Sequence, residues 1–245
     1  NVFNTPDFKL SVFANASYNK NEIVEINDND QSGNSTVNVL GGPVMQWNLI
    51  PYVGVNQSNG NLLFLDKEGN VTETPDPVTD RRTTGKSTLP KYQGGFGFNT
   101  DYKGFYADVM FTWTKDAWRY DNQLRWASDP AVIGQDNLSA DLLNAWTIDN
   151  PTGYPSLAAE NREFDVDSDR YLFDSSFLRL KSVSFGYNFS KSFLDKTFMT
   201  GWKVYMQAEN LLTFTKWRGF DPEGLSPMYV SGYPNPKTVS FGLSV

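Results

Sequence analysis

The sequence predicts an all-β fold: an antiparallel sheet of about six long strands that forms one segment of a transmembrane β-barrel. The first observation is the stretch 177–189, where apolar and small polar side chains alternate strictly from Val183 onward. Because side chains alternate across a strand, this stretch has one aromatic face and one small polar face. The second is composition, with 15% aromatic residues, 19 glycines and no long helical runs. The third is that long connections alternate with short ones along the chain, as in outer-membrane barrels.

Composition excludes several classes of function. The chain has no cysteine and no histidine, so thiol chemistry, disulfides and histidine-based metal or triad sites are absent. A formal charge of -7 argues against nucleic acid as a partner. We see no catalytic constellation and no cofactor site, and therefore expect no enzyme activity. No basic segment followed by an apolar run opens the sequence, which predicts a mature or partial chain.

The first three predicted strands span residues 8–18, 92–100 and 105–113. In the first, alternate residues from Phe8 to Tyr18 are apolar or aromatic, and Phe13 is the one apolar residue on the other face. A half-exposed strand of a soluble sandwich is the alternative, although such strands are usually shorter, about 5–6 residues. The next two form a hairpin around residues 101–104.

The fourth strand, 177–189, carries the first set of predicted lipid-facing residues: Val183, Phe185, Tyr187 and Phe189. We expect Arg179 and Lys181 on the same face, where they meet lipid phosphates or loop carboxylates. The fifth strand covers 202–215 and the sixth 237–245. The sixth contributes the second lipid-facing set: Val239, Phe241 and Leu243.

Three long excursions separate these strands. Residues 19–90 contain a small hairpin, with arms at 51–56 and 61–66. Residues 115–174 contain one short helix, capped by Asn137 or Ser139 and running to about Trp146. The third excursion covers 217–236. Six strands are too few to close a membrane barrel, which needs at least about eight. Either the chain is a piece of a larger barrel or it contains further strands.

The second excursion also holds the candidate substrate-binding residues. Aromatic rings stack on sugar rings, and arginine donates to hydroxyls or carbonyls. The set is Trp118, Arg119, Tyr120, Arg125 and Trp126. Packing within the loop is the alternative. The acidic run Asp165, Asp167 and Asp169 is interpreted as a solvated loop rather than a cation site.

Four segments resemble one known family. In chain order they are Pro51-Tyr-Val-Gly-Val-Asn56 with Asn59-Gly-Asn61, Leu142-Leu-Asn-Ala-Trp-Thr147 followed by Asn150-Pro151, Ser176-Phe-Leu-Arg-Leu-Lys-Ser-Val-Ser-Phe-Gly-Tyr-Asn-Phe189, and Ala208-Glu-Asn-Leu-Leu-Thr-Phe-Thr-Lys216 with Gly219-Phe-Asp-Pro-Glu223 and then Tyr233-Pro-Asn-Pro-Lys-Thr238. In this order they resemble the C-terminal region of SusC/RagA-like TonB-dependent transporters of Bacteroidetes. The resemblance implies a plugged barrel of about 22 strands, of which residues 1–245 are the C-terminal part.

The resemblance also implies a function and partners. The function is TonB-dependent uptake of oligosaccharides or oligopeptides across the bacterial outer membrane. The partners are the rest of the barrel and its plug, TonB through an N-terminal region outside this sequence, a SusD-like surface lipoprotein, and outer-membrane lipid. Because such barrels end in an aromatic residue, we expect the natural chain to continue about two residues beyond Val245. A receptor for a siderophore or vitamin and a soluble glycan-binding β-sandwich are the alternatives.

Overall fold

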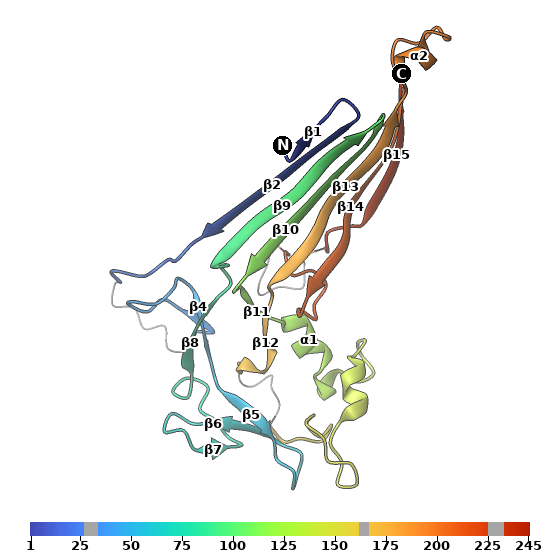
Figure 1. Cartoon of the computed structure of the whole chain (residues 1–245). Helices are drawn as coiled ribbons and strands as arrows, with labels where there is room; N and C mark the ends of the chain where they lie inside the picture. Colours follow the sequence, from blue (N-terminus) through green and yellow to red (C-terminus); the bar gives the residue numbers. More distant parts are fainter. Residues whose placement is uncertain (27–33, 162–166, 225–232) are drawn as a thin grey trace.

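The computed structural model describes residues 1–26, 34–161, 167–224 and 233–245. Its main feature is one antiparallel sheet of seven strands in the order β1-β2-β9-β10-β13-β14-β15 (Figure 1). The strands are β1 (Phe3–Asn4), β2 (Phe8–Tyr18), β9 (Tyr92–Tyr102), β10 (Phe105–Lys115), β13 (Phe177–Asn188), β14 (Lys203–Thr215) and β15 (Thr238–Ser244). The six long strands confirm the predicted fold class. The two-residue β1, which pairs with the start of β2, was not predicted.

The register gives the sheet two chemically different faces. Residues directly opposite one another share a face, and one row across six strands is entirely apolar: Val12, Phe98, Val109, Val183, Ala208 and Val239. The adjacent row points to the other side and is entirely polar: Ser11, Asn99, Asp108, Ser184, Gln207 and Ser240. We call these the apolar face and the polar face.

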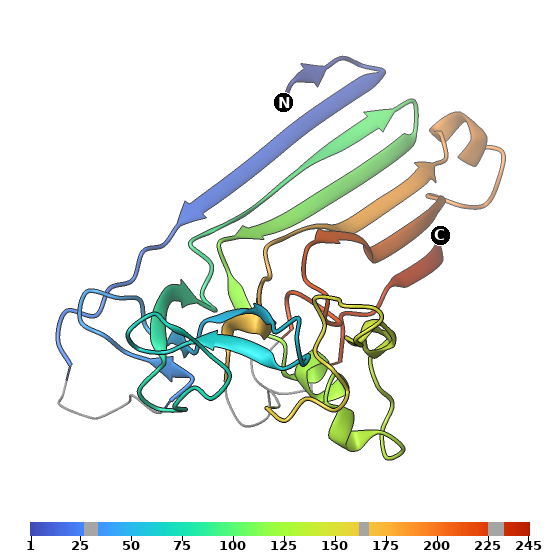
Figure 2. The same ribbon diagram turned by 90° about the horizontal axis from the view of Figure 1, so that it is seen from below.

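The apolar face is largely uncovered. Phe185 is 48% exposed and Phe241 is 80% exposed, and no second large sheet packs on this face among the described residues. A soluble β-sandwich buries one face of each sheet against the other. The single sheet therefore has the form of a barrel wall, open at both edges (Figure 2).

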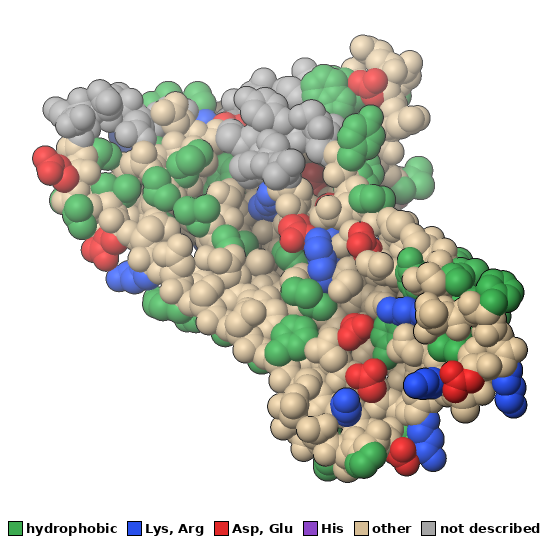
Figure 3. Space-filling view, turned by 90° about the horizontal axis from the view of Figure 1, so that it is seen from above, with side chains coloured by type: hydrophobic (Ala, Val, Ile, Leu, Met, Phe, Trp, Pro, Cys, Tyr) green, Lys and Arg blue, Asp and Glu red, His purple; other side chains and the backbone are tan. Residues whose placement is uncertain are grey.

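The connections differ in length at the two ends of the sheet, as predicted. At one end β9 and β10 are joined by a tight turn, in which Lys103 has φ 47° and Gly104 has φ 92°. Two positive φ values match the twist of a hairpin and favour glycine at the second position. The other short connection contains α2 (Lys191–Leu194). Basic and acidic side chains are interspersed over this end, which faces the viewer in Figure 3.

At the opposite end the long connections build small structures of their own. They form three small sheets, β3 (Thr36–Val37) with β4 (Gln46–Leu49) and β8 (Arg82–Ser87), β5 (Tyr52–Val55) with β6 (Leu62–Leu65) and β7 (Val71–Thr72), and β11 (Trp118–Tyr120) with β12 (Leu172–Asp174). The β5–β6 hairpin confirms the prediction for residues 51–66. The main buried core lies in this region rather than in the large sheet: Trp47, Leu49, Tyr120, Tyr171 and Leu172 pack together.

The helical content of the second excursion differs from the prediction of one short helix. The expected segment is a 3-10 helix, Ala140–Asn144, with Ser139 as its N-cap, and it ends before Trp146. An α-helix that was not predicted, α1 (Asn122–Ala127), precedes it and is capped by Asp121. Two further 3-10 turns cover Pro130–Val132 and Asp169–Tyr171. Within the described ranges, no helix has the length and apolar character needed to span a bilayer.

The predicted orientation of Arg179 is wrong, because a β-bulge interrupts β13. Ser182 lies opposite Met110 while Leu180 lies opposite Phe111, so Lys181 is an extra residue in the pairing. An extra residue inverts the alternation on either side of it. Leu180 consequently joins the apolar face, and Arg179, opposite Thr112, joins the polar face.

Candidate functional site

The loop end of the polar face carries a buried ion pair. Arg179 is 2% exposed, and its Nη2 donates to Asp221 Oδ1 at 2.5 Å while Nη1 donates to Oδ2 at 3.3 Å. Asp221 also accepts the backbone N–H groups of Glu223 and Asn235, both at 2.8 Å. One carboxylate thus holds two separate parts of the loop after β14 against a residue of β13.

The electrostatics of this pair favour the charged forms. Burial by itself would raise the pKa of Asp221, but hydrogen bonds from Arg179 and from two backbone N–H groups outweigh burial, and the pKa lies below its ordinary value. Glu223 approaches Arg179 Nη1 at 3.5 Å and Lys181 Nζ at 3.7 Å. Arg179 and Lys181 therefore pair with loop carboxylates, one of the two outcomes considered for them.

A second arginine–carboxylate cluster joins the first and second excursions. Asp167 accepts from Arg125 Nη1 at 2.7 Å, Arg81 Nη2 at 3.1 Å and Ser35 Oγ at 2.5 Å. Burial raises its pKa, but Ser35, Arg125 and Arg81 together lower it below the ordinary value. The interpretation of this run as a solvated loop is wrong for Asp167, whose carboxylate is tied to three partners; Asp165 lies outside the described residues.

The hairpin of the first excursion is organised around Glu73. Its carboxylate accepts from the side-chain amides of Asn56 at 2.5 Å, Asn61 at 2.7 Å and Asn59 at 3.0 Å. These three donors lower its pKa, with Asn61 contributing most. Asn161 then ties the hairpin to the second excursion by donating to Leu62 O and Glu73 O. The asparagines of the Asn59-Gly-Asn61 motif therefore have a structural task.

The five predicted substrate-binding residues do not gather on one surface. Trp118 packs at the edge of the loop core, with Lys86 Nζ 3.8 Å above its ring. Tyr120 lies within that core at 5% exposure, and Arg125 is held by Asp167. Arg119 donates to the carbonyl of Gly224, and burial lowers its pKa. Trp126 is 45% exposed and donates to Asp136 at 3.1 Å.

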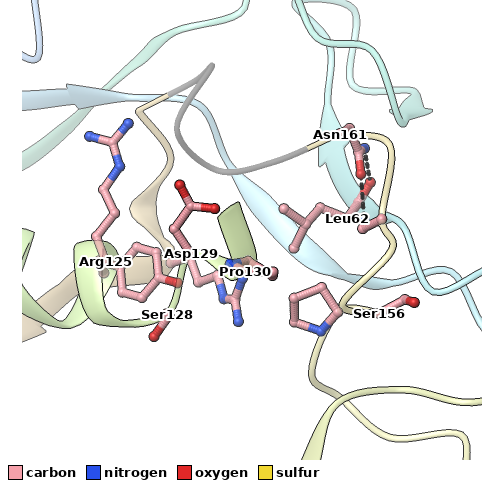
Figure 4. Close-up of a pocket in the computed structure, with 11 residues that line it drawn as sticks. Leu62, Arg125, Ser128, Asp129, Pro130, Ser156 and Asn161 are labelled. Carbon is pink, nitrogen blue, oxygen red and sulfur yellow. Dashed lines mark hydrogen bonds between the residues drawn. The ribbon is translucent and has the colours of Figure 1, made fainter. Parts of the chain in front are cut away.

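One small cavity lies between α1 and the β5–β6 hairpin (Figure 4). Leu62, Arg125, Pro130 and Ser156 are among its lining residues. Its enclosed volume is about 20 Å³, which is room for about one water molecule. This cavity is therefore too small for a cargo molecule. Within the described ranges, no cluster of three or more acidic residues is arranged to hold a metal ion.

The predicted lipid-facing residues fall on one side of the sheet. Tyr187 lies opposite Phe105 and Val204, and Leu243 lies opposite Val204, so both belong to the apolar face. Phe189 follows the end of β13 and stacks on Trp202, with ring centroids 4.4 Å apart. Asp108 and Glu209, both mid-strand carboxylates, lie on the polar face.

Comparison with known proteins gives consistent matches at the level of sequence and fold, although no protein-family model matches. The chain is 29% identical over 98% of its length to TonB-dependent receptor P3 of Formosa agariphila, and 24% identical over 98% to TonB-dependent receptor SusC of Bacteroides thetaiotaomicron. It spans about a quarter of the length of each, 27% and 25%.

Solved structures of transporters also match nearly the whole chain. The RagAB peptide transporter superposes with a TM-score of 0.86 at 28% identity, covering 98% of this chain and 27% of the RagAB chain. The same importer in its open-open state gives a TM-score of 0.87 at 27% identity, with the same shares covered. The motifs, the two-faced sheet and these matches together identify the chain as SusC/RagA-like, with the fold of one segment of a TonB-dependent transporter barrel.

Proposed function

We propose that residues 1–245 form the C-terminal part of a TonB-dependent importer of the bacterial outer membrane. The observation that carries the proposal is the open sheet with one uncovered apolar face and one polar face. In lipid, an apolar face needs no second layer, whereas the two unpaired edges require further strands. The rest of the barrel supplies those strands and encloses a plug.

The apolar face lies against lipid and the polar face lines the lumen. Six long strands of 7 to 13 residues fit the length of transmembrane strands, about 9–11 residues. The short-turn end lies in the periplasm and the loop region lies outside the cell. On this orientation β13 descends from the outer surface, with Arg179 high and Asn188 near the periplasm.

The imported cargo is an oligopeptide or an oligosaccharide. The RagAB relatives are described as peptide importers, which supports the first class. Of the five candidate residues, Trp126 has the most exposed surface for cargo contact, while Trp118, Arg119, Tyr120 and Arg125 position the loop that carries it. TonB acts through the plug, and a SusD-like lipoprotein covers the loop region.

The test is protease treatment of intact cells followed by membrane fractionation. We expect trypsin to cut only in the loop region, while fragments that contain β9, β10, β13 and β14 remain in the outer-membrane fraction. The short-turn segment with Lys191 and Lys196 should be cut only after the outer membrane is permeabilised. Recovery of the intact protein in the soluble fraction would contradict the proposal.

A further inference from the structure

The apolar face ends in a lysine where β10 meets the loop region (Figure 1). Lys115, the last residue of β10, lies opposite Tyr92, which in turn lies opposite Tyr18. Residues directly opposite one another share a face, so this exposed lysine belongs to the apolar face. A charged side chain on a lipid-facing surface is costly at the bilayer centre and cheap only near the head groups.

The length of β10 places this lysine at the depth of the head groups. At the short-turn end of the same face, one row across four strands is wholly aromatic: Phe8, Tyr102, Phe105 and Tyr187. Phe105 and Lys115 are the first and last of the 11 residues of β10. At about 3.4 Å per residue and a tilt of about 35–45°, this strand covers about 24–28 Å across the membrane. The apolar band of such barrels is about 25 Å tall, so Lys115 lies at its outer boundary.

A second lysine lies at the same boundary. Lys216 is exposed and directly follows Thr215, the last residue of β14. Leu212 and Phe214 precede it on the apolar face, and both are exposed. Alternation carries Lys216 to the same side of the sheet. Because β14 is the second strand from β10, the two lysines are about 10 Å apart, which is close enough for one lipid head group to contact both. We call Lys115 and Lys216 the rim lysines.

The positive charge of the rim lysines is not neutralised by the protein. Two nearby lysines have carboxylate partners: Lys91 Nζ lies 2.7 Å from Asp116 Oδ2, and Lys20 Nζ lies 3.2 Å from Glu22 Oε2. Among the described residues, neither rim lysine forms an ion pair with a carboxylate. The outer boundary of the apolar face is therefore cationic, although the chain as a whole has a formal charge of -7.

We propose that the rim lysines, Tyr18 and Tyr92 bind the phosphorylated head group of a glycolipid in the outer leaflet. The lysines contact its phosphates, because anionic lipid head groups attract basic side chains at the membrane surface. The two tyrosine rings, with centroids 5.0 Å apart, offer aromatic surface to its sugar rings. A phospholipid head group supplies the phosphate but no sugar ring. The inference rests on the proposed outer-membrane location and names the lipid that this boundary recognises.

Binding of lipid to the full-length transporter, purified and delipidated in a neutral detergent, tests the site. The probes are lipid A with both phosphates, a synthetic analogue that lacks both phosphates, and phosphatidylglycerol, each measured by displacement of fluorescent lipid A. We expect the analogue without phosphates to bind about 25-fold more weakly than lipid A, which corresponds to about fivefold for each lysine contact. Phosphatidylglycerol should also bind more weakly, and added salt should reduce lipid A binding.

Substitution of the rim lysines gives the second readout. Lys115→Gln and Lys216→Gln should each weaken lipid A binding about fivefold, and the double variant about 25-fold. The analogue without phosphates should bind the double variant and the wild type equally. The matched control is the double variant Lys191→Gln with Lys196→Gln, which removes the same charge at the short-turn end and should bind lipid A as the wild type does. Migration of unheated protein on denaturing gels establishes that each variant is folded.

Three results would overturn the proposal. They are equal binding of lipid A and its analogue without phosphates, equal binding of phosphatidylglycerol and lipid A, and equal losses in the rim variant and in the control. None of them touches the import function, which cell fractionation tests independently. A transporter that fractionates with the outer membrane and shows one of these results would retain the proposed function and lose this lipid site.

Discussion

Arg179 in β13 and Asp221 in the loop after β14 form a two-point hydrogen-bonded ion pair, and both side chains are almost completely buried, at 2% and 6% exposure. The pair joins the wall to a loop 42 residues further along the chain. Because Asp221 also accepts two backbone N–H groups of the loop, loss of its carboxylate removes several contacts at once.

Asp221→Ala is expected to release this loop from the polar face. Removing one partner of a buried pair costs roughly 3–5 kcal/mol, since the other charge stays buried. Trypsin should then cut at Lys216 and Arg218 at least ten times faster than in the wild type, measured on the folded transporter. Asp195→Ala, at an exposed carboxylate beyond α2, is the control. Equal cleavage rates in the two variants would contradict the anchoring role.

The same contact should depend on pH. The folded-state pKa of Asp221 lies below the ordinary value, which is about 3.9 for an unfolded chain. A depressed pKa stabilises the fold above the unfolded value, and this stabilisation is lost as pH falls through the folded value. Hydrogen exchange in residues 217–224, corrected for intrinsic rates, should stay constant from pH 7 to 5 and accelerate below about pH 4. Asp221→Asn should lose this acid-induced change.

The two faces of β13 can be tested at neighbouring positions. Lysine on a lipid-facing position costs about 2–4 kcal/mol at the bilayer midplane, whereas a lumen-facing position tolerates it. Phe185→Lys should lower the free energy of unfolding from lipid vesicles in urea by that amount, and Ser184→Lys by far less. If the larger effect belongs to Ser184→Lys, the assignment of the faces is reversed.

Asn210 offers a test of backbone strain in β14. It has φ 53° at the place where two residues of β14 face the bulge of β13. A residue other than glycine, asparagine or aspartate costs about 1–2 kcal/mol in this conformation. Asn210→Gly and Asn210→Val both lose the hydrogen bond to Pro236 O, so the difference between them isolates the backbone. We expect the valine variant to unfold at a lower urea concentration.

The long strands could be predicted from the sequence, because each is a run of residues that alternate between apolar and polar with a period of two. The start of β2 at Phe8, the turn at Gly104 and the shared face of Val183 and Phe185 follow from that alternation and from turn chemistry. The β5–β6 hairpin was equally visible, because polar turn residues separate its two apolar arms.

Other features were hidden because they depend on contacts between distant segments. The core formed by Trp47 and Tyr120 joins two excursions, and no local pattern shows that Tyr120 is buried. Likewise, Arg179 meets Asp221 only after the loop folds back onto the sheet. The bulge at Lys181 was missed because pairing, rather than periodicity, defines an extra residue. Ser182, Val183 and Ser184 continue the alternation directly after Lys181, so the sequence pattern itself does not reveal the bulge.

That single extra residue has a consequence for how such a protein can change over evolutionary time. Long loops accept insertions of any length, whereas within a regular strand one added or deleted residue exchanges inside and outside for everything beyond it. At Lys181 a bulge takes up the extra residue, so Leu180 lies opposite Phe111 and Arg179 opposite Thr112. Loss of Lys181 would leave these pairs in place and make the ladder between β13 and β10 regular. This is therefore the one place in β13 where a change of a single residue in length keeps Arg179 turned toward its carboxylate.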